Sequence, residues 1–277
     1  MNTKQLRYIF LALCLTIRVS IHAQQQPDLA LPAQNELINP SFNPAMNEIA
    51  CFATYDIAVT PLQVAFTAGA LWTGLTNNHH YGLAFRYSGL SFARLYDIEA
   101  RYGYTWTIAE HHQLSLGGLL QLNASHLLTR PDLGLGLTYR FADWTLAVSA
   151  RNLIGSAWTD STSMILNERR IYAYTDYFGR LNGDRVALVP HLLLWYGTHS
   201  VGIDLGLNAH FLLTDLTKSV HSVYLGYTCR AATFYNIVEA GISFPASENQ
   251  FCKLSFAYFL PNYSGTQTAQ VQFTYTW

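Results

Sequence analysis

Charged residues are scarce in this chain of 277 residues. Only 12% of the residues are charged, while 50% are hydrophobic and 14% are aromatic. A typical soluble domain has about 25% charged residues, so this shortage indicates that much of the outer surface does not face water. The formal net charge of −1 offers no electrostatic attraction to nucleic acid.

Long hydrophobic runs are also missing. No segment after the N-terminal region has about eighteen uninterrupted apolar residues, so no transmembrane helix is expected. The N-terminal region carries Lys4 and Arg7, then an apolar run at 8–17, then Ala23. This order is typical of a secretory signal peptide over residues 1–23, cleaved between Ala23 and Gln24. The alternative is a membrane anchor, for which the run is too short.

Cysteines are few after this leader and have no zinc-binding spacing. Cys51, Cys229 and Cys252 make an odd number, and no CxxC element occurs. A fully paired disulfide framework is therefore excluded. A single bond between Cys229 and Cys252 stays open, provided that their strands are neighbours.

Catalytic motifs are absent as well. The sequence has no G-x-S-x-G element, no Walker loop and no H-E-x-x-H element. The adjacent histidines His79 and His80 would point to opposite faces of a strand, which makes them a poor metal chelate. We therefore expect no enzyme activity, no cofactor and no metal. A set of Asp204, His210 and a serine from another strand is the alternative.

What the sequence does contain is alternation with a period of two. Residues 271–276 and Trp277 place Phe273, Tyr275 and Trp277 on one face, and polar residues between them on the other. An aromatic residue at the end of such a strand is typical of the last strand of a bacterial outer-membrane barrel. Phe273, Tyr275 and Trp277 are our expected C-terminal barrel signal.

The same rhythm recurs along the chain in segments of about the length that a tilted strand needs to cross a bilayer. The expected strands are 52–60, 62–73, 79–88, 96–108, 112–127, 133–141, 144–153, 170–177, 186–197, 201–211, 220–230, 234–244, 251–260 and 271–277. Between twelve and about fourteen strands can be counted, and the even number of about fourteen is preferred for a bacterial barrel.

Charged residues in these segments fall on the polar face. Arg86, Arg140, Arg151 and Asp204 are expected to form a small polar network in a narrow lumen. Aromatic residues near strand ends, Trp195 among them, are expected in girdles at the membrane interfaces. Glycines on the inner face leave room for something to occupy the lumen.

The predicted fold is therefore an all-β transmembrane outer-membrane β-barrel of about fourteen antiparallel strands over residues 51–277. Short turns alternate with longer loops, and the longest stretch without alternation, 154–185, is expected outside the cell around one short strand. Residues 24–50 do not alternate. They form either a linker or an N-terminal plug or periplasmic segment.

Several motifs resemble the PorP/SprF family of outer-membrane proteins of the type IX secretion system in Bacteroidetes. The Ala23-Gln24 junction is similar to the family's mature start, and Asn39-Pro40-Ser41-Phe42 is similar to its Asn-Pro-Ala-Tyr element. Asn43 and Pro44 stand where the family has Ala and Gly. Segments 131–153 and 223–227 resemble the family's central pair of strands and its glycine-tyrosine strand.

This resemblance implies an outer-membrane accessory component of type IX secretion. Such a protein would help export or anchor a surface protein, with gliding adhesins among the family's associates. The implied partners are outer-membrane lipid, subunits of the secretion machinery and a secreted surface protein as cargo. The alternative is a FadL-like channel for small hydrophobic molecules, since FadL-like barrels also carry an Asn-Pro-Ala element.

Overall fold

The computed structural model describes most of the chain after its N-terminal region. The described residues are 39–41, 48–59, 62–89, 94–125, 129–154, 169–181, 185–197, 201–213, 221–231, 235–247, 250–260 and 267–276. Within these ranges, no helix is long and apolar enough to cross a membrane. The expected signal peptide, Phe42 and Trp277 lie outside the described residues.

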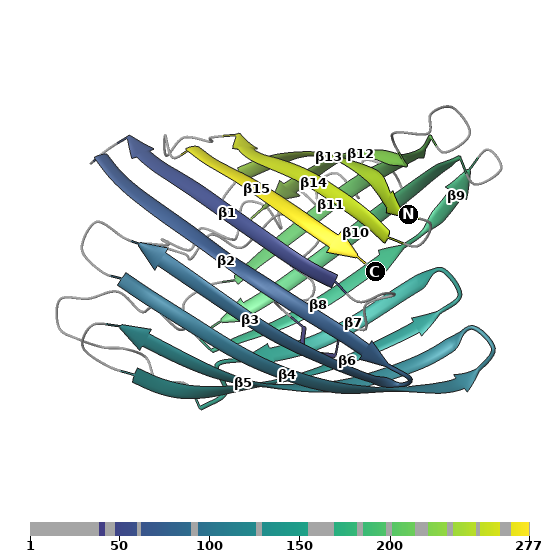
Figure 1. Cartoon of the computed structure of the whole chain (residues 1–277), viewed down its shortest axis with the longest axis horizontal. Coiled ribbons are helices and arrows are strands. Elements are labelled where there is room, and N and C mark those ends of the chain that lie inside the picture. The colour runs from purple at the N-terminus through teal and green to yellow at the C-terminus, as the bar shows by residue number, and fades with distance from the viewer. Residues whose placement is uncertain are drawn as a thin grey trace, which may run out of the picture.

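All regular structure in these ranges is β (Figure 1). The strands are β1 (Glu48–Val59), β2 (Leu62–Thr76), β3 (His79–Gly89), β4 (Arg94–Ala109), β5 (His112–Ser125), β6 (Thr129–Phe141), β7 (Trp144–Arg151), β8 (Arg170–Tyr177), β9 (Gly179–Leu181), β10 (Val186–Gly197), β11 (Val201–Leu212), β12 (Ser222–Arg230), β13 (Tyr235–Ser247), β14 (Gln250–Leu260) and β15 (Gln267–Thr276).

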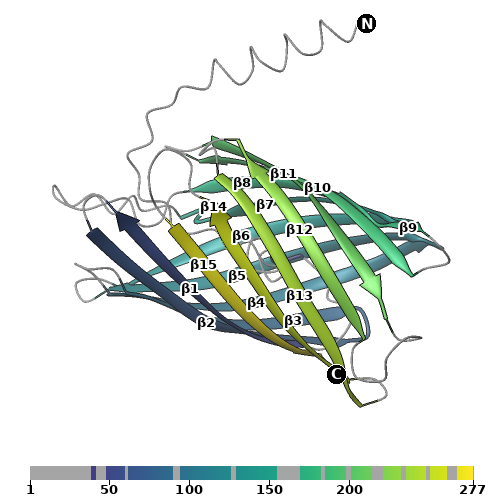
Figure 2. The same cartoon turned by 90° about the horizontal axis from the view of Figure 1, so that it is seen from above.

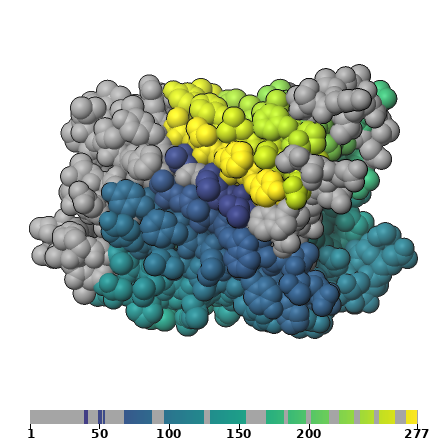
Figure 3. All heavy atoms as spheres, in the orientation of Figure 1, coloured from purple at the N-terminus to yellow at the C-terminus, as the bar shows by residue number. Residues whose placement is uncertain are grey.

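The sheet closes on itself. Strands that follow one another in the chain pair antiparallel, except that β8 and β9 both pair with β10, and β1 pairs with β15, with Glu48 opposite Thr276. Figures 1 and 2 show the yellow strand β15 beside the dark β1 from two directions. In Figure 3 the yellow atoms of β15 lie against the purple atoms of β1. Among the described strands, closure leaves no exposed sheet edge, as a spanning sheet requires in lipid.

The barrel wall consists of fourteen strands. β8 and β9 both pair with β10, at its two ends, so they are two parts of one strand interrupted at Phe178. Fifteen strand segments therefore make a closed antiparallel barrel of 14 strands. The even number predicted from the sequence is confirmed, and so is the all-β transmembrane fold.

Alternation in the sequence becomes a difference between the two faces of the wall. In β6, Leu133, Leu135 and Leu137 point outward, with Leu135 57% exposed, while Asp132 and Thr138 point inward and are buried. A soluble protein buries its leucines and exposes its charged residues, so the arrangement in this wall is the reverse. It is the arrangement expected when the outer face of the barrel contacts lipid hydrocarbon.

Short turns join the strands at one rim of the barrel. Asn77, His111 and Ala142 adopt positive φ angles of 53°, 71° and 48° in the connections β2–β3, β4–β5 and β6–β7. Two-residue hairpin turns with positive φ match the twist of the flanking strands. β1 begins and β15 ends at this same rim, since Glu48 pairs with both Thr73 and Thr276. Short turns mark it as the periplasmic rim.

Candidate functional site

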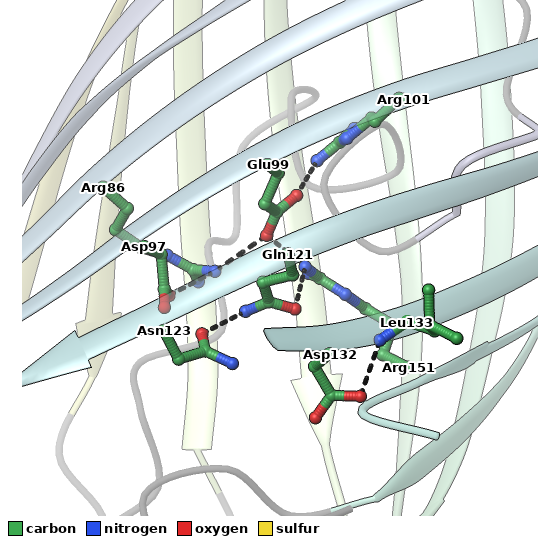
Figure 4. A network of polar contacts seen from close by, with 9 residues as sticks. All are labelled: Arg86, Asp97, Glu99, Arg101, Gln121, Asn123, Asp132, Leu133 and Arg151. Atoms are coloured by element: carbon green, nitrogen blue, oxygen red, sulfur yellow. Dashed lines mark hydrogen bonds and ion pairs between the residues drawn. The ribbon is translucent and has the colours of Figure 1, made fainter. Parts of the chain in front are cut away.

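The interior of the barrel is the candidate site, because it is where the charged residues gather. A network on the inner wall of β3 to β7 is centred on Glu99, which is 1% exposed (Figure 4). Its carboxylate accepts hydrogen bonds from Arg101 Nη2 at 2.6 Å and from Arg86 Nη2 at 3.3 Å. A third donor is Arg151, which reaches Glu99 from β7. One buried carboxylate is thus shared by three guanidinium groups.

Further acidic and amide groups complete this network. Asp97 lies 3.0 Å from Arg86 in a second ion pair. Gln121 accepts from Arg151 at 3.3 Å and donates to Asn123 Oδ1 at 2.6 Å. With Asp97 and Glu99 against Arg86, Arg101 and Arg151, two negative charges meet three positive ones. Buried charges persist when they are paired and hydrogen-bonded in this way.

A separate carboxylate on β6, that of Asp132, holds the backbone by hydrogen bonds. Asp132 Oδ1 accepts from the backbone N–H groups of Leu133 at 2.7 Å and Ile154 at 3.1 Å. Leu133 N–H belongs to β6 itself, and Ile154 lies just after the end of β7. The carboxylate therefore fixes the point where the chain leaves the wall for the segment that follows β7.

A second polar cluster lies on the wall formed by β10 to β14. Asp204 of β11 accepts from Arg230 of β12 through both carboxylate oxygens, at 2.9 Å from Nε and 2.7 Å from Nη2. The Arg230 guanidinium lies 5.2 Å from the ring centroid of Trp195 and 6.0 Å from that of Phe259. A bidentate pair between aromatic rings is among the strongest arrangements available to arginine.

Trp195 is a correction to the sequence analysis. It was expected in an interfacial girdle, but it points inward and is 2% exposed. Its indole stacks under Arg230 and occupies the space over Gly202, where a Cβ would lie 1.8 Å from the ring. The neighbouring Tyr196 carries the outward position instead and is well exposed.

The outer face near the periplasmic rim carries the aromatic band that a membrane interface favours. His79 Nδ1 and the hydroxyl of Tyr102 lie 2.7 Å apart, and His112 Nδ1 and the hydroxyl of Tyr139 lie 2.6 Å apart. Ring contacts continue along the band from Tyr81 to Trp106 and from His112 to Tyr177. Amphipathic rings with polar tips suit the headgroup level.

The predicted lumenal residues occupy different parts of the interior. Arg86 and Arg151 belong to the Glu99 network, and Asp204 belongs to the Arg230 cluster. Arg140 shares the inward parity of Thr138 and is half-buried near the periplasmic end of β6. The four residues thus lie on one face of the wall but do not form a single network.

The two remaining groups of predicted residues lie at the ends of the barrel domain. Phe273 and Tyr275 take outward positions on β15, with Gln272 and Thr274 inward. Asn39, Pro40 and Ser41 belong to no strand, yet all three are buried. Asn39 Nδ2 donates to Thr138 Oγ1 on the inner wall at 2.7 Å, so this turn contacts the lumen side of β6.

Sequence reasoning missed Asp97, Glu99, Arg101 and Arg230 as members of the networks. A signal was present, because Asp97, Glu99 and Arg101 alternate with apolar residues along β4. Their mutual pairing had no signal, since Arg151 lies 52 residues from Glu99 in the chain.

The cysteines and the alternative catalytic set do not come together. Cys51, Cys229 and Cys252 are all free thiols, and β13 separates β12 from β14, so Cys229 and Cys252 are not on neighbouring strands. Asp204 is held by Arg230, while His210 stacks on Tyr224 with ring centroids 5.4 Å apart. Among the described residues, no group of three His, Cys, Asp or Glu side chains is placed to hold a metal ion.

The family model for the type IX secretion system membrane protein PorP/SprF matches residues 121–261, which is more than half of the chain. The chain belongs to the PorP/SprF family. The match covers β6 to β14 completely, and with them the Asp204–Arg230 cluster and three members of the Glu99 network, Gln121, Asn123 and Arg151. A PorP/SprF protein with an outer-membrane barrel is located in the outer membrane. None of the curated proteins compared with the chain matches it.

Solved structures with a similar fold are outer-membrane barrels. The Pseudomonas putida toluene transporter TodX is 8% identical over 88% of this chain and 92% of its own, with a TM-score of 0.54. The Acinetobacter baumannii outer membrane protein Omp33 is 10% identical over 84% of this chain and 98% of its own, with a TM-score of 0.51. At such low identity these likenesses concern the fold alone.

Proposed function

We propose that this PorP/SprF protein is an accessory component of type IX secretion that helps export or anchor a surface protein. It acts through protein–protein contacts and without catalytic turnover. Its periplasmic rim of short turns meets subunits of the secretion machinery, and its opposite rim meets the cargo. Gliding adhesins are the class of cargo that the family resemblance suggests.

The observation that carries this proposal is the polar, closely packed lumen. Inward side chains in a water-filled pore would be accessible to solvent, but Glu99, Thr138 and Gln270 are each 1% exposed. These residues lie on β4, β6 and β15, so the burial extends around the wall and is not confined to one strand. A barrel with such an interior supports a role at its rims better than a role as an open conduit.

The same observation counts against the alternative function. TodX is a toluene transporter, and a channel for small hydrophobic molecules needs a continuous apolar path. The inner wall instead presents Glu99, Asp204 and their arginine partners toward the lumen. Moving an apolar ligand past these groups would require their ion pairs to be desolvated or displaced, which is unfavourable.

A deletion strain with plasmid complementation tests the proposal. Surface proteins of the wild-type, deletion and complemented strains would be compared by mass spectrometry, together with uptake of a monoaromatic hydrocarbon. The proposal predicts that one or a few surface proteins disappear in the deletion strain and return on complementation, with unchanged uptake. An intact surface proteome with reduced uptake would overturn it and establish the channel.

A further inference from the structure

The described part of the N-terminal region contacts the inner wall of the barrel, as the plug alternative for residues 24–50 requires. Asn39, Pro40 and Ser41 lie outside every strand, yet Ser41 is 0% exposed and the other two are buried as well. Polar residues of a loose leader would normally be solvated, because burial of an amide or a hydroxyl is unfavourable unless hydrogen bonds compensate.

The compensating hydrogen bonds form a closed ring. Asn39 Nδ2 donates to Thr138 Oγ1 at 2.7 Å, and the Ser41 hydroxyl donates to Asn39 Oδ1 at 2.8 Å. Ser41 and Thr138 hydroxyls lie 2.7 Å apart. Because the Ser41 proton is used toward Asn39, Thr138 must be the donor in this last bond. The backbone N–H of Ser41 also donates to Asn39 Oδ1, at 3.0 Å.

Two glycines on the wall make room for this turn. Gly117 of β5 and Gly136 of β6 are direct partners across the sheet, and both face inward. A Cβ on Gly117 would lie 2.1 Å from the carbonyl oxygen of Pro40, and one on Gly136 would lie 2.0 Å from Asn39 Oδ1. No side chain at either position is compatible with the bound turn, so the wall here is bare backbone that the turn covers.

We infer that Gly117, Gly136 and Thr138 form a peptide-binding site on the inner wall, which holds the Asn39-Pro40-Ser41 turn of the same chain as a plug in the lumen. The occupant is this chain's own segment because only six residues separate Ser41 from the start of β1 at Glu48. A tether that short gives an effective concentration on the order of millimolar or more. The inference goes beyond the proposed role in secretion and does not depend on it.

A disulfide trap tests the site in the full-length protein. Cys51, Cys229 and Cys252 are first replaced by serine, and Ser41→Cys is then combined with Thr138→Cys. Since the two hydroxyls lie 2.7 Å apart, mild oxidation should link the two new thiols in most folded molecules, as detected by mass spectrometry of the linked peptides. The matched control pairs Ser41→Cys with Gln272→Cys, an inward position on β15, far from β6 in the strand order.

Glycine variants of the disulfide-trap protein test the shape of the site. Gly117→Leu should lower the yield of the bond between positions 41 and 138 by about tenfold, or about 1.4 kcal/mol, because overfilling a packed contact is destabilising. Gly118→Ala is the control, since a Cβ on this outward neighbour meets nothing closer than 3.8 Å. Folding of each variant is checked by its shifted migration on unheated gels.

The inference is overturned if the pair at 41 and 138 does not link in folded protein, or if it links no better than the pair at 41 and 272. An unchanged yield in the Gly117→Leu variant would also overturn it, because the turn would then not need the bare wall.

Discussion

Neutralising Glu99 should destabilise the barrel far more than neutralising an exposed glutamate. The Glu99→Gln change keeps the size and shape of the side chain, so it isolates the charge. It removes the negative charge that Arg86, Arg101 and Arg151 share. Removing one member of a buried ion pair costs about 3–5 kcal/mol, since the other is left buried without compensation.

The control is Glu110→Gln. Glu110 lies in the β4–β5 turn, with a side chain that is 92% exposed and a distant contact of 3.8 Å to His111. Surface substitutions of this kind usually change stability by less than about 0.5 kcal/mol. The free energy of unfolding would be measured by urea titration of the refolded protein in lipid vesicles, with tryptophan fluorescence and gel migration as two probes.

A double variant separates loss of charge balance from loss of packing. Arg151→Gln added to Glu99→Gln removes one positive charge along with the negative one, so the two costs should not add, with a coupling energy of about 0.5–3 kcal/mol. The reasoning would be refuted if the free energies of unfolding of the Glu99→Gln and Glu110→Gln variants differed by less than about 1 kcal/mol. It would also be refuted if the costs of Glu99→Gln and Arg151→Gln simply added in the double variant.

Three further predictions concern the outer face, a turn and the second cluster. Leu135→Arg, in the middle of the lipid-facing wall, should cost about 2–4 kcal/mol in vesicles, and Thr76→Arg at the periplasmic end of β2 about 0–1 kcal/mol; equal costs would contradict the assigned membrane depth. Ala142→Gly should stabilise the β6–β7 turn by up to about 1 kcal/mol because Ala142 has a φ of 48°. Ala147→Gly, within β7, should instead destabilise the protein by about 0.5–1 kcal/mol. If urea titrations showed that both glycine variants stabilise or both destabilise the protein, the turn geometry would be contradicted. Arg230→Met should cost about 3–5 kcal/mol because it removes the arginine of a buried ion pair, and a neutral result would show that this pair carries no stability.

Much of the barrel could be predicted because one physical rule acts on every strand. Lipid on one side and a polar lumen on the other force alternation, so segments such as 201–211 reveal both the strand and the direction of each side chain. The rule fails where both faces are apolar. Residues 192–196 are Leu-Leu-Leu-Trp-Tyr, which gives no facing signal, and Trp195 was accordingly assigned to the wrong side.

Pairing inside the lumen could not be predicted, because it depends on which strands are neighbours and on their register. The period of two places Arg151 and Glu99 on the inner face, but only the fold brings β7 to the carboxylate on β4. The site for residues 39–41 also depends on strand register. Gly117 and Gly136 leave a part of the inner wall without side chains only because the β5–β6 register sets them opposite each other.

The central claim, that this barrel works through protein partners in type IX secretion, is tested most directly by affinity purification. The tagged protein would be isolated from native outer membranes after mild crosslinking, and the bound proteins identified by mass spectrometry against an unrelated tagged barrel. The account predicts recovery of secretion-machinery subunits or of a large surface protein. Isolation of a solitary barrel that carries only lipid would contradict it.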